Sequence, residues 1–191
     1  MRNYKILVLL AHPNLHTSTI NKAMISAIES LDFVLIHNLY ENYPDFYINV
    51  EEEKRLLKEA DLVVFQSPFY WYSVTPLLKL WEDEVLEQGF AYGDGGNELE
   101  GKDFLLALST GGKQEAYRRE GYNYYTMTEL LTPFAATASL CGMNYLEPFV
   151  IHGSYTQNGE QVQNHARQYQ QSLQTYVEKG CWVLNEDRRD D

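Results

Sequence analysis

Short apolar runs alternate with segments of helical periodicity along almost the whole chain. The runs are nearly continuous and mostly β-branched or aromatic, which is typical of strands buried on both faces of a parallel sheet. Because parallel strands need helical crossovers of one hand, the alternation predicts an α/β fold with a doubly wound five-stranded parallel sheet, order 2-1-3-4-5, and helices on both faces. The five runs are residues 6–11, 33–36, 62–65, 104–108 and 149–151.

Helices are predicted between these runs from apolar spacing and from start and stop signals. Asn49 and Glu52 have the spacing of a capping box, Thr75 and Pro76 supply an N-cap and a first-turn proline, and Gly142 ends the fourth helix. Residues 1–180 are interpreted as one domain, with a glycine-rich surface insertion at 88–102 and a C-terminal tail at 181–191. The predicted helices are 20–31, 49–60, one starting at 75–76, 130–140 and 162–176.

The acidic balance argues against two classes of partner. With 15 Lys and Arg against 27 Asp and Glu, the formal charge is -12, the wrong sign for a phosphate backbone or an anionic membrane. Cys141 and Cys181 match neither a zinc site nor a disulfide framework. The first apolar run is too short for a secretory signal, and no run reaches the roughly 18 residues that span a membrane. We therefore expect a soluble cytoplasmic protein that binds no nucleic acid.

Three loops that follow predicted strands have the composition of a ligand site. In doubly wound sheets, ligands bind outside the carboxyl ends of the strands. The first loop carries Thr17, Ser18, Thr19 and Asn21 at the start of a helix, where free N–H groups and the positive helix end attract an anion such as phosphate. An ordinary hydroxyl-rich N-cap is the alternative.

The second loop, residues 67–73, contains the adjacent aromatics Phe69, Tyr70, Trp71 and Tyr72. Core packing is the alternative, but four consecutive rings cannot all point inward, which favours a stacking wall for a planar ligand. The third loop, residues 109–112, ends in two glycines that let backbone amides approach a ligand, although glycine pairs are also common in turns. Together the loops supply the phosphate pocket, aromatic wall and backbone edge that flavin mononucleotide (FMN) requires.

Three other patterns are interpreted without a function. Residues 96–103 have phosphate-loop spacing, but Asp103 replaces the Ser or Thr that binds magnesium and the segment precedes a strand. His12 and His16 have the spacing of two ligands on one helix face, but Pro13 prevents a regular helix between them, so no metal site is expected. The acidic run Glu51 to Glu53 is interpreted as a solvated first helical turn.

Six motifs occur in a characteristic order along about residues 5 to 175. They are Ala11-His12-Pro13 with Ser18 and Asn21, Leu39-Tyr40 with Tyr43-Pro44-Asp45-Phe46, Pro68 with Trp71-Tyr72-Ser73, Pro76-Leu77-Leu78-Lys79-Leu80-Trp81, Gly89-Phe90-Ala91-Tyr92-Gly93, and Thr110-Gly111-Gly112. By this ordered set the chain resembles the flavodoxin-like NAD(P)H:quinone oxidoreductases, and most closely the ancillary flavoproteins of glutathione-regulated potassium-efflux systems.

The resemblance implies a flavodoxin-like fold and a homodimer with its two active sites at the subunit interface. It also implies FMN as the cofactor, with FAD as the alternative, because the long quinone reductases have a C-terminal region for the adenine half of FAD for which this chain is too short. The implied cofactor-binding residues are His12, Ser18, Thr19, Ile20, Asn21, Pro68, Phe69, Tyr70, Trp71, Tyr72, Ser109, Thr110, Gly111 and Gly112.

Catalytic roles are expected for the Gly111 and Gly112 amides, which would stabilise the reduced ring, and for Tyr117, which would donate a hydrogen bond to a ring or acceptor oxygen. The long reductases place a tyrosine and a histidine in this loop. Tyr117 falls at the tyrosine position, whereas Asn123 occupies the histidine position and cannot accept a proton near neutral pH as imidazole can. A strict copy of that relay is not expected.

The leading hypothesis is an FMN-dependent oxidoreductase in which NAD(P)H reduces the flavin, leaves, and a quinone or similar planar electrophile takes two electrons. One alternative is a regulatory flavoprotein subunit of a glutathione-gated potassium-efflux antiporter, held peripherally at the inner membrane through an interface near Tyr40 and residues 43–46. Another is a one-electron carrier like flavodoxin. Residues 117–125, rich in tyrosine, suggest room for an organic substrate and disfavour that alternative.

Overall fold

The computed structural model describes residues 5–184 and contains a single parallel sheet. The strand order is β2-β1-β3-β4, with β5 and β6 both paired to the far side of β4. The predicted order 2-1-3-4-5 is confirmed, but the fifth position is divided. β5, which the sequence analysis missed, is separated from β6 by a link containing Pro148, which has no N–H to donate to the ladder. The strands are β1 (Ile6–Leu10), β2 (Val34–Asn38), β3 (Leu62–Pro68), β4 (Asp103–Ser109), β5 (Asn144–Tyr145) and β6 (Phe149–Ile151).

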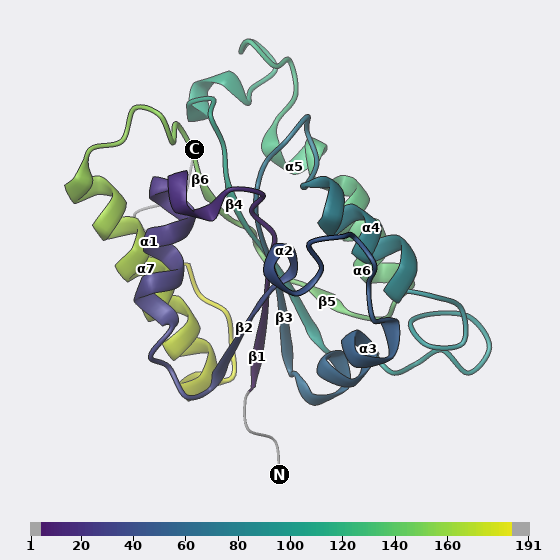
Figure 1. Cartoon of the computed structure of the whole chain (residues 1–191). Coiled ribbons are helices and arrows are strands. Elements are labelled where there is room, and N and C mark those ends of the chain that lie inside the picture. Colours follow the sequence, from purple (N-terminus) through teal and green to yellow (C-terminus); the bar gives the residue numbers. More distant parts are fainter. Residues whose placement is uncertain (1–4, 185–191) are drawn as a thin grey trace.

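Helices cover both faces of the sheet (Figure 1). α1 and α7 lie together on one face, and α3, α4 and α6 cover the other. Each predicted helix is present, and α2 and the short α5 are additional. Within residues 5–184, no helix is both long and apolar enough to cross a membrane. The helices are α1 (Thr19–Ile28), α2 (Leu39–Asn42), α3 (Val50–Glu59), α4 (Pro76–Val85), α5 (Met127–Leu130), α6 (Thr132–Leu140) and α7 (Gly159–Lys179), with 3-10 turns η1 (Leu15–Thr17) and η2 (Gln114–Ala116).

The central strands are buried on both faces, as their continuous apolar sequences predict. Along β1, Ile6 and Val8 pack with α1 and α7, whereas Leu7 and Leu9 pack toward α3 and α4. Successive side chains of a strand point to opposite faces, so each strand contributes to two apolar layers. The position of each loop at the carboxyl edge is therefore fixed by strands that cannot slip in register.

Local hydrogen bonds explain where α1 and α3 begin, whereas the N-cap predicted for α4 is not formed. Ser18 Oγ accepts from Asn21 N at the start of α1 (3.2 Å) and Asn49 Oδ1 accepts from Glu52 N at the start of α3 (3.3 Å). Thr75 precedes α4 as predicted, but its side chain makes no cap and its hydroxyl donates to Ala11 O instead (3.0 Å). The bond joins the loop after β3 to the end of β1.

The glycine-rich segment 88–102 connects α4 to β4 and is fixed to the core by part of its length. Phe90, Ala91 and Leu99 are buried, and the ammonium groups of Lys54 and Lys58 lie over the Phe90 ring. The segment is therefore not wholly a surface feature. Of the predicted tail at 181–191, residues 185–191 lie outside the described part of the chain.

The expectation of a solvated acidic turn is wrong for Glu53, whose side chain is fully buried. Its carboxylate contacts three polar groups: Tyr43 OH, His37 Nε2 (2.7 Å) and Trp81 Nε1 (2.7 Å). Burial and the contact with Glu53 raise the pKa of Tyr43, so its hydroxyl stays protonated and donates. The buried carboxylate thereby ties α3 to β2, to the end of α2 and to α4.

Glu53→Gln should lower the free energy of unfolding by about 3 kcal/mol, because an amide loses the negative charge and turns N–H groups toward the donors around it. Glu51→Gln, in the same acidic run but with its side chain 85% exposed, is the matched control and should leave stability nearly unchanged. Urea titration of both variants measures the difference. Equal midpoints for the two variants would contradict a structural role for the Glu53 carboxylate.

Candidate functional site

A cavity of about 510 Å³ lies where the loops after β1, β3, β4 and β6 meet, a size within the usual range for small-molecule sites. The cofactor-binding residues expected from the resemblance all line it except Asn21 and Thr110. Tyr117 and Asn123 line it too, although they are distant in sequence from the first two loops. Lining residues outside the expected cofactor-binding and catalytic sets are Thr17, Ala116, Tyr122, Asn123, Ser154 and Tyr155, of which Thr17 belongs to the polar loop noted in the sequence.

One end of the cavity is suited to an anion without using a charged side chain. The N–H groups of Thr19 and Ile20 begin α1 and have no partner inside that helix. His12 Nδ1 accepts from Asn14 N (3.1 Å), and burial lowers the pKa of His12, so the neutral ring carries its proton on Nε2. Among the described residues that line the cavity there is no Lys, Arg, Asp or Glu. The helix end and neutral donors therefore attract the anion.

Asn21 and Thr110 lie beneath the cavity instead of in its lining. Asn21 is fully buried, and its Nδ2 donates to Ser109 Oγ (2.9 Å), which joins the first turn of α1 to the end of β4. Thr110 is also buried, and its hydroxyl donates to Gly112 O (2.7 Å). Both side chains hold the lining in position, so their contribution to a ligand is indirect.

The aromatic loop after β3 is a tight turn with two residues in a left-handed conformation. Tyr70 and Ser73 exchange both backbone hydrogen bonds (3.0 Å each), and the central residues Trp71 and Tyr72 have φ of 50° and 64°. Turns of this kind normally place Gly, Asn or Asp at these positions. Two aromatic side chains are thus held at the cavity mouth against a local backbone cost, which is a common signature of a functional site.

The glycine pair after β4 leaves backbone surface that a side chain would cover. A Cβ on Gly111 would lie 2.7 Å from the Tyr155 ring, and one on Gly112 would lie 3.2 Å from the Tyr117 hydroxyl. Only glycine fits this cradle without displacing an aromatic ring. The site therefore combines an anion pocket, an aromatic wall and a bare amide edge, which fits a planar ligand with an anionic tail.

Tyr117 and Asn123 come together on one side of this cavity. The Tyr117 ring packs edge-on against Phe69 (6.2 Å between centroids) and lies 5.2 Å from the His152 ring. Burial raises the pKa of Tyr117, while the nearby Thr110 hydroxyl opposes the rise. Asn123 Oδ1 accepts from Tyr72 OH (3.2 Å). Asn123 therefore supports the aromatic wall.

Sequence reasoning missed the loop after β6, which brings His152 and Tyr155 to the site. The signal was present, because this loop also follows the carboxyl end of a predicted strand. It was overlooked because His152-Gly153-Ser154 has no recognisable ligand motif.

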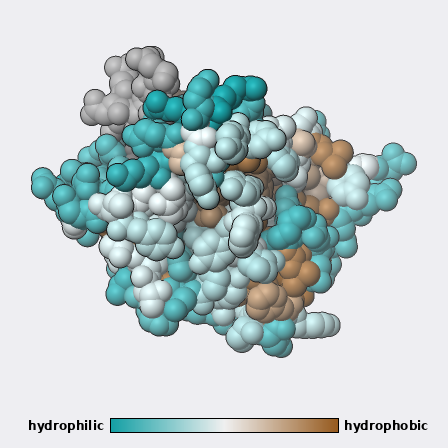
Figure 2. All heavy atoms as spheres, turned by 90° about the horizontal axis from the view of Figure 1, so that it is seen from above, coloured by the Kyte–Doolittle hydropathy of each residue, from teal (hydrophilic) through white to brown (hydrophobic). Residues whose placement is uncertain are grey.

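The mouth of the cavity is surrounded by exposed aromatic side chains. Trp71, Tyr122 and Tyr155 are 92%, 86% and 89% exposed, and Figure 2 looks onto this edge of the sheet, where apolar side chains are visible within a recess. A monomeric protein rarely exposes so many large rings around one opening. The cavity therefore opens to solvent among these exposed rings.

Trp71→Gly should raise the free energy of unfolding of the ligand-free protein by about 1 kcal/mol, because glycine adopts positive φ without strain. The indole itself contributes little packing at 92% exposure. Tyr47→Gly is the control, since Tyr47 is 82% exposed but is not among the residues with positive φ, and it should lose stability. Chemical denaturation decides the sign, and a stability loss in Trp71→Gly would show that the turn is unstrained.

Comparison with known proteins agrees with this geometry. The chain is 42% identical to the glutathione-regulated potassium-efflux system ancillary protein KefG of Yersinia enterocolitica, over 92% of this chain and 96% of that protein. A solved structure of general stress protein 14 from Treponema denticola, in complex with FMN, is 40% identical with a TM-score of 0.85, covering 90% of this chain and 98% of that one. The NADPH-quinone reductase of P. pentosaceus is 34% identical with a TM-score of 0.80, covering 87% and 96%.

The match to a family extends over nearly all of the described chain. Residues 4–173 match the family described as having a flavodoxin-like fold, and this range includes each strand and all loops around the cavity. The parallel sheet order and the position of the cavity at the carboxyl edge are those expected of a flavodoxin-like fold. The chain therefore belongs to the flavodoxin-like family that includes the KefG-type ancillary proteins and quinone reductases of this size.

Proposed function

We propose that the protein is an FMN-dependent NAD(P)H:quinone oxidoreductase. The observation that carries the proposal is the cavity itself, in which the free N–H groups at the start of α1 stand opposite the bare Gly111–Gly112 backbone and the aromatic turn. Support also comes from the FMN complex of the general stress protein 14 relative.

The cavity residues would hold FMN by its two ends. The phosphate would be bound by the backbone amides of Thr19 and Ile20, by the Ser18 hydroxyl and by the Nε2–H group of neutral His12. The ring would lie between the aromatic turn and the Gly111–Gly112 edge. Bound FMN would supply two-electron chemistry, taking a hydride from NAD(P)H and delivering it to a quinone in a separate half-reaction.

The remaining groups would serve that chemistry without forming a covalent bond. The Gly111 and Gly112 amides offer fixed donors to a ring edge that gains negative charge on reduction. Tyr117 is protonated near neutral pH because burial raises its pKa, so its hydroxyl can donate to the oxygen of a bound acceptor. Asn123 instead holds Tyr72 and has no proton to exchange near neutral pH.

A homodimer is part of the proposal. The exposed rings of Trp71, Tyr122 and Tyr155 surround the open side of the cavity, and a second copy placed there would complete two equivalent sites across a two-fold axis. Sedimentation velocity tests this directly. A monomer at micromolar concentration would contradict it.

The purified protein should be yellow or take up FMN, lose flavin absorbance on anaerobic addition of NADH or NADPH, and recover it on addition of a quinone. In Gly111→Ala the added methyl would meet the Tyr155 ring at 2.7 Å, and we expect FMN affinity to fall about tenfold. Gly159→Ala is the matched control, because a methyl there meets nothing within 4 Å.

Two outcomes would decide against this function. A folded, colourless protein that binds neither FMN nor FAD would end it. Stable accumulation of a neutral semiquinone during reduction, with slow turnover of quinones, would instead favour a one-electron carrier.

The similarity to KefG favours a second candidate, a regulatory subunit of a potassium-efflux antiporter. The segment expected to form that interface is partly internal: Tyr43 is buried against Glu53, while Phe46 and Tyr47 are 42% and 82% exposed. The docking surface would therefore consist of Phe46, Tyr47 and the adjacent Asp45. A formal charge of -12 suits a basic cytoplasmic face of such a partner.

Co-purification with an antiporter encoded nearby should succeed at low salt and weaken as salt rises, because attraction between exposed charges is screened. Tyr47→Ser should weaken the association further, whereas Tyr124→Ser, at another exposed tyrosine, serves as the control. Absence of any association at low salt, together with rapid quinone reduction, would leave a free-standing reductase as the better account.

A further inference from the structure

Tyr155 lines the cavity proposed for FMN but packs against almost nothing in its own chain. Its side chain is 89% exposed, and among the described residues it makes no hydrogen bond and no ring contact. One edge of the ring approaches Gly111, where a Cβ would lie 2.7 Å from Tyr155 Cε2. The ring is therefore presented to the cavity and not to the core.

The backbone that carries Tyr155 is held across the glycine pair. Gly153 N donates to Gly112 O (2.8 Å) and Ser154 N donates to Thr110 O (2.9 Å). These two hydrogen bonds join the loop after β6 to the loop after β4, and both lie within two residues of Tyr155 in the sequence. The position of the Tyr155 backbone relative to the glycine pair is thus fixed independently of any ligand, which lowers the cost of binding against it.

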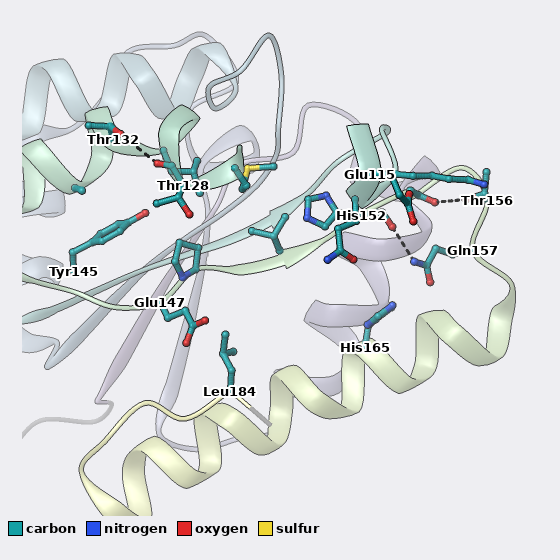
Figure 3. Close-up of a pocket in the computed structure, with 18 residues that line it drawn as sticks. Glu115, Thr128, Thr132, Tyr145, Glu147, His152, Thr156, Gln157, His165 and Leu184 are labelled. Carbon is teal, nitrogen blue, oxygen red and sulfur yellow. Dashed lines mark hydrogen bonds between the residues drawn. The ribbon is translucent and has the colours of Figure 1, made fainter. Parts of the chain in front are cut away.

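Side-chain hydrogen bonds close the same turn. Thr156 Oγ1 donates to Gly153 O (3.0 Å) and Gln157 Nε2 donates to His152 O (2.9 Å), as Figure 3 shows. Gly153 has a φ of 70°, a left-handed conformation that favours glycine. The turn also borders a second cavity of about 630 Å³, which is the pocket drawn in Figure 3. It is therefore a firm support for the exposed Tyr155 side chain.

The loop that carries Tyr155 runs from one end of the FMN cavity toward the other. It begins beside the Gly111–Gly112 edge, to which Gly153 is bonded. It ends at α7, whose first residues line a neighbouring cavity together with residues 16–19, which lead into α1. Tyr155 therefore lies between the edge that would meet the flavin ring and the anion pocket that would meet the phosphate.

We propose that Tyr155 covers the ribityl chain of bound FMN, which joins the ring to the phosphate, and so slows the departure of the cofactor. The inference rests on the proposed function, which supplies FMN as the ligand. A tyrosine ring offers a flat apolar face to the carbon chain, and its hydroxyl can hydrogen-bond one of the hydroxyls of the chain. Tyr155 takes no part in the redox steps, so its role is to hold the cofactor.

Dissociation of FMN from the loaded protein, followed as the rise in flavin fluorescence after dilution, measures this contact. Tyr155→Ala should raise the dissociation rate about tenfold and leave the association rate nearly unchanged, because lost contacts act mostly on departure. Tyr155→Phe keeps the ring and loses one hydrogen bond, so its rate should rise by about fivefold at most. Tyr47→Ala is the matched control, since Tyr47 is 82% exposed but does not line the cavity, and it should keep the wild-type rate.

Flavins that differ only at the chain give a sharper test. Riboflavin has the ribityl chain without the phosphate, whereas lumiflavin has a methyl group in place of the chain. Tyr155→Ala should weaken the binding of FMN and riboflavin by similar factors and leave the affinity for lumiflavin unchanged. Equal weakening for all three flavins would overturn the inference, because a general change in the shape of the cavity would act on each of them.

Three other results have distinct meanings. An unchanged FMN dissociation rate in Tyr155→Ala would overturn the inference and leave the FMN-dependent function intact. Conversion of a wild-type dimer into monomers by Tyr155→Ala, measured by sedimentation velocity, would assign the ring to the contact between subunits and overturn its role at the chain. A wild-type protein that binds no flavin would overturn the proposed function and this inference together.

Discussion

The hydrogen bond from Asn21 Nδ2 to Ser109 Oγ holds the start of α1 against the end of β4, and the cavity exists because these two points are fixed. Both residues are buried, so the bond is made away from water, where an unpaired partner would be costly. It sets the separation between the anion pocket and the glycine edge. A ligand that spans both points meets groups that are already in position, so little free energy is spent on ordering them when it binds.

Further bonds of the same kind connect the other loops at this edge of the sheet. Phe69 N donates to Ser109 O (2.8 Å), and Thr75 Oγ1 donates to Ala11 O (3.0 Å). Each joins loops that follow different strands, so no loop around the cavity is positioned by its own sequence alone. The aromatic turn can keep its left-handed residues because its base is held by this network.

The sequence predicted the fold well because continuous apolar runs and helical stripes report burial directly. It also located most of the cavity lining, since the rule that ligands bind beyond the strand ends depends only on strand order. The distant partners of the Thr75 and Asn21 side chains could not be predicted. Both have the composition of cap or ligand residues, but their actual hydrogen-bond partners, Ala11 and Ser109, are 64 and 88 residues away.

Glu53 and His152 show the same limit for ionisable groups. Glu53 follows two glutamates in an apparent surface turn, and only the fold brings Tyr43 and Trp81 to its carboxylate. His152 contacts Thr110 and Tyr117, which belong to another loop. The residue type and its local sequence pattern cannot indicate which distant side chains the fold brings into contact with it.

The absence of charged side chains among the described residues of the cavity lining has a kinetic consequence for a protein of formal charge -12. An anion approaching the site first meets a repulsive long-range field and is attracted only at short range, by the end of α1 and its neutral donors. Added salt screens the repulsion at a distance but hardly affects contacts inside the cavity. Capture of an anionic ligand therefore becomes faster as ionic strength rises, while its residence time is governed by the local donors.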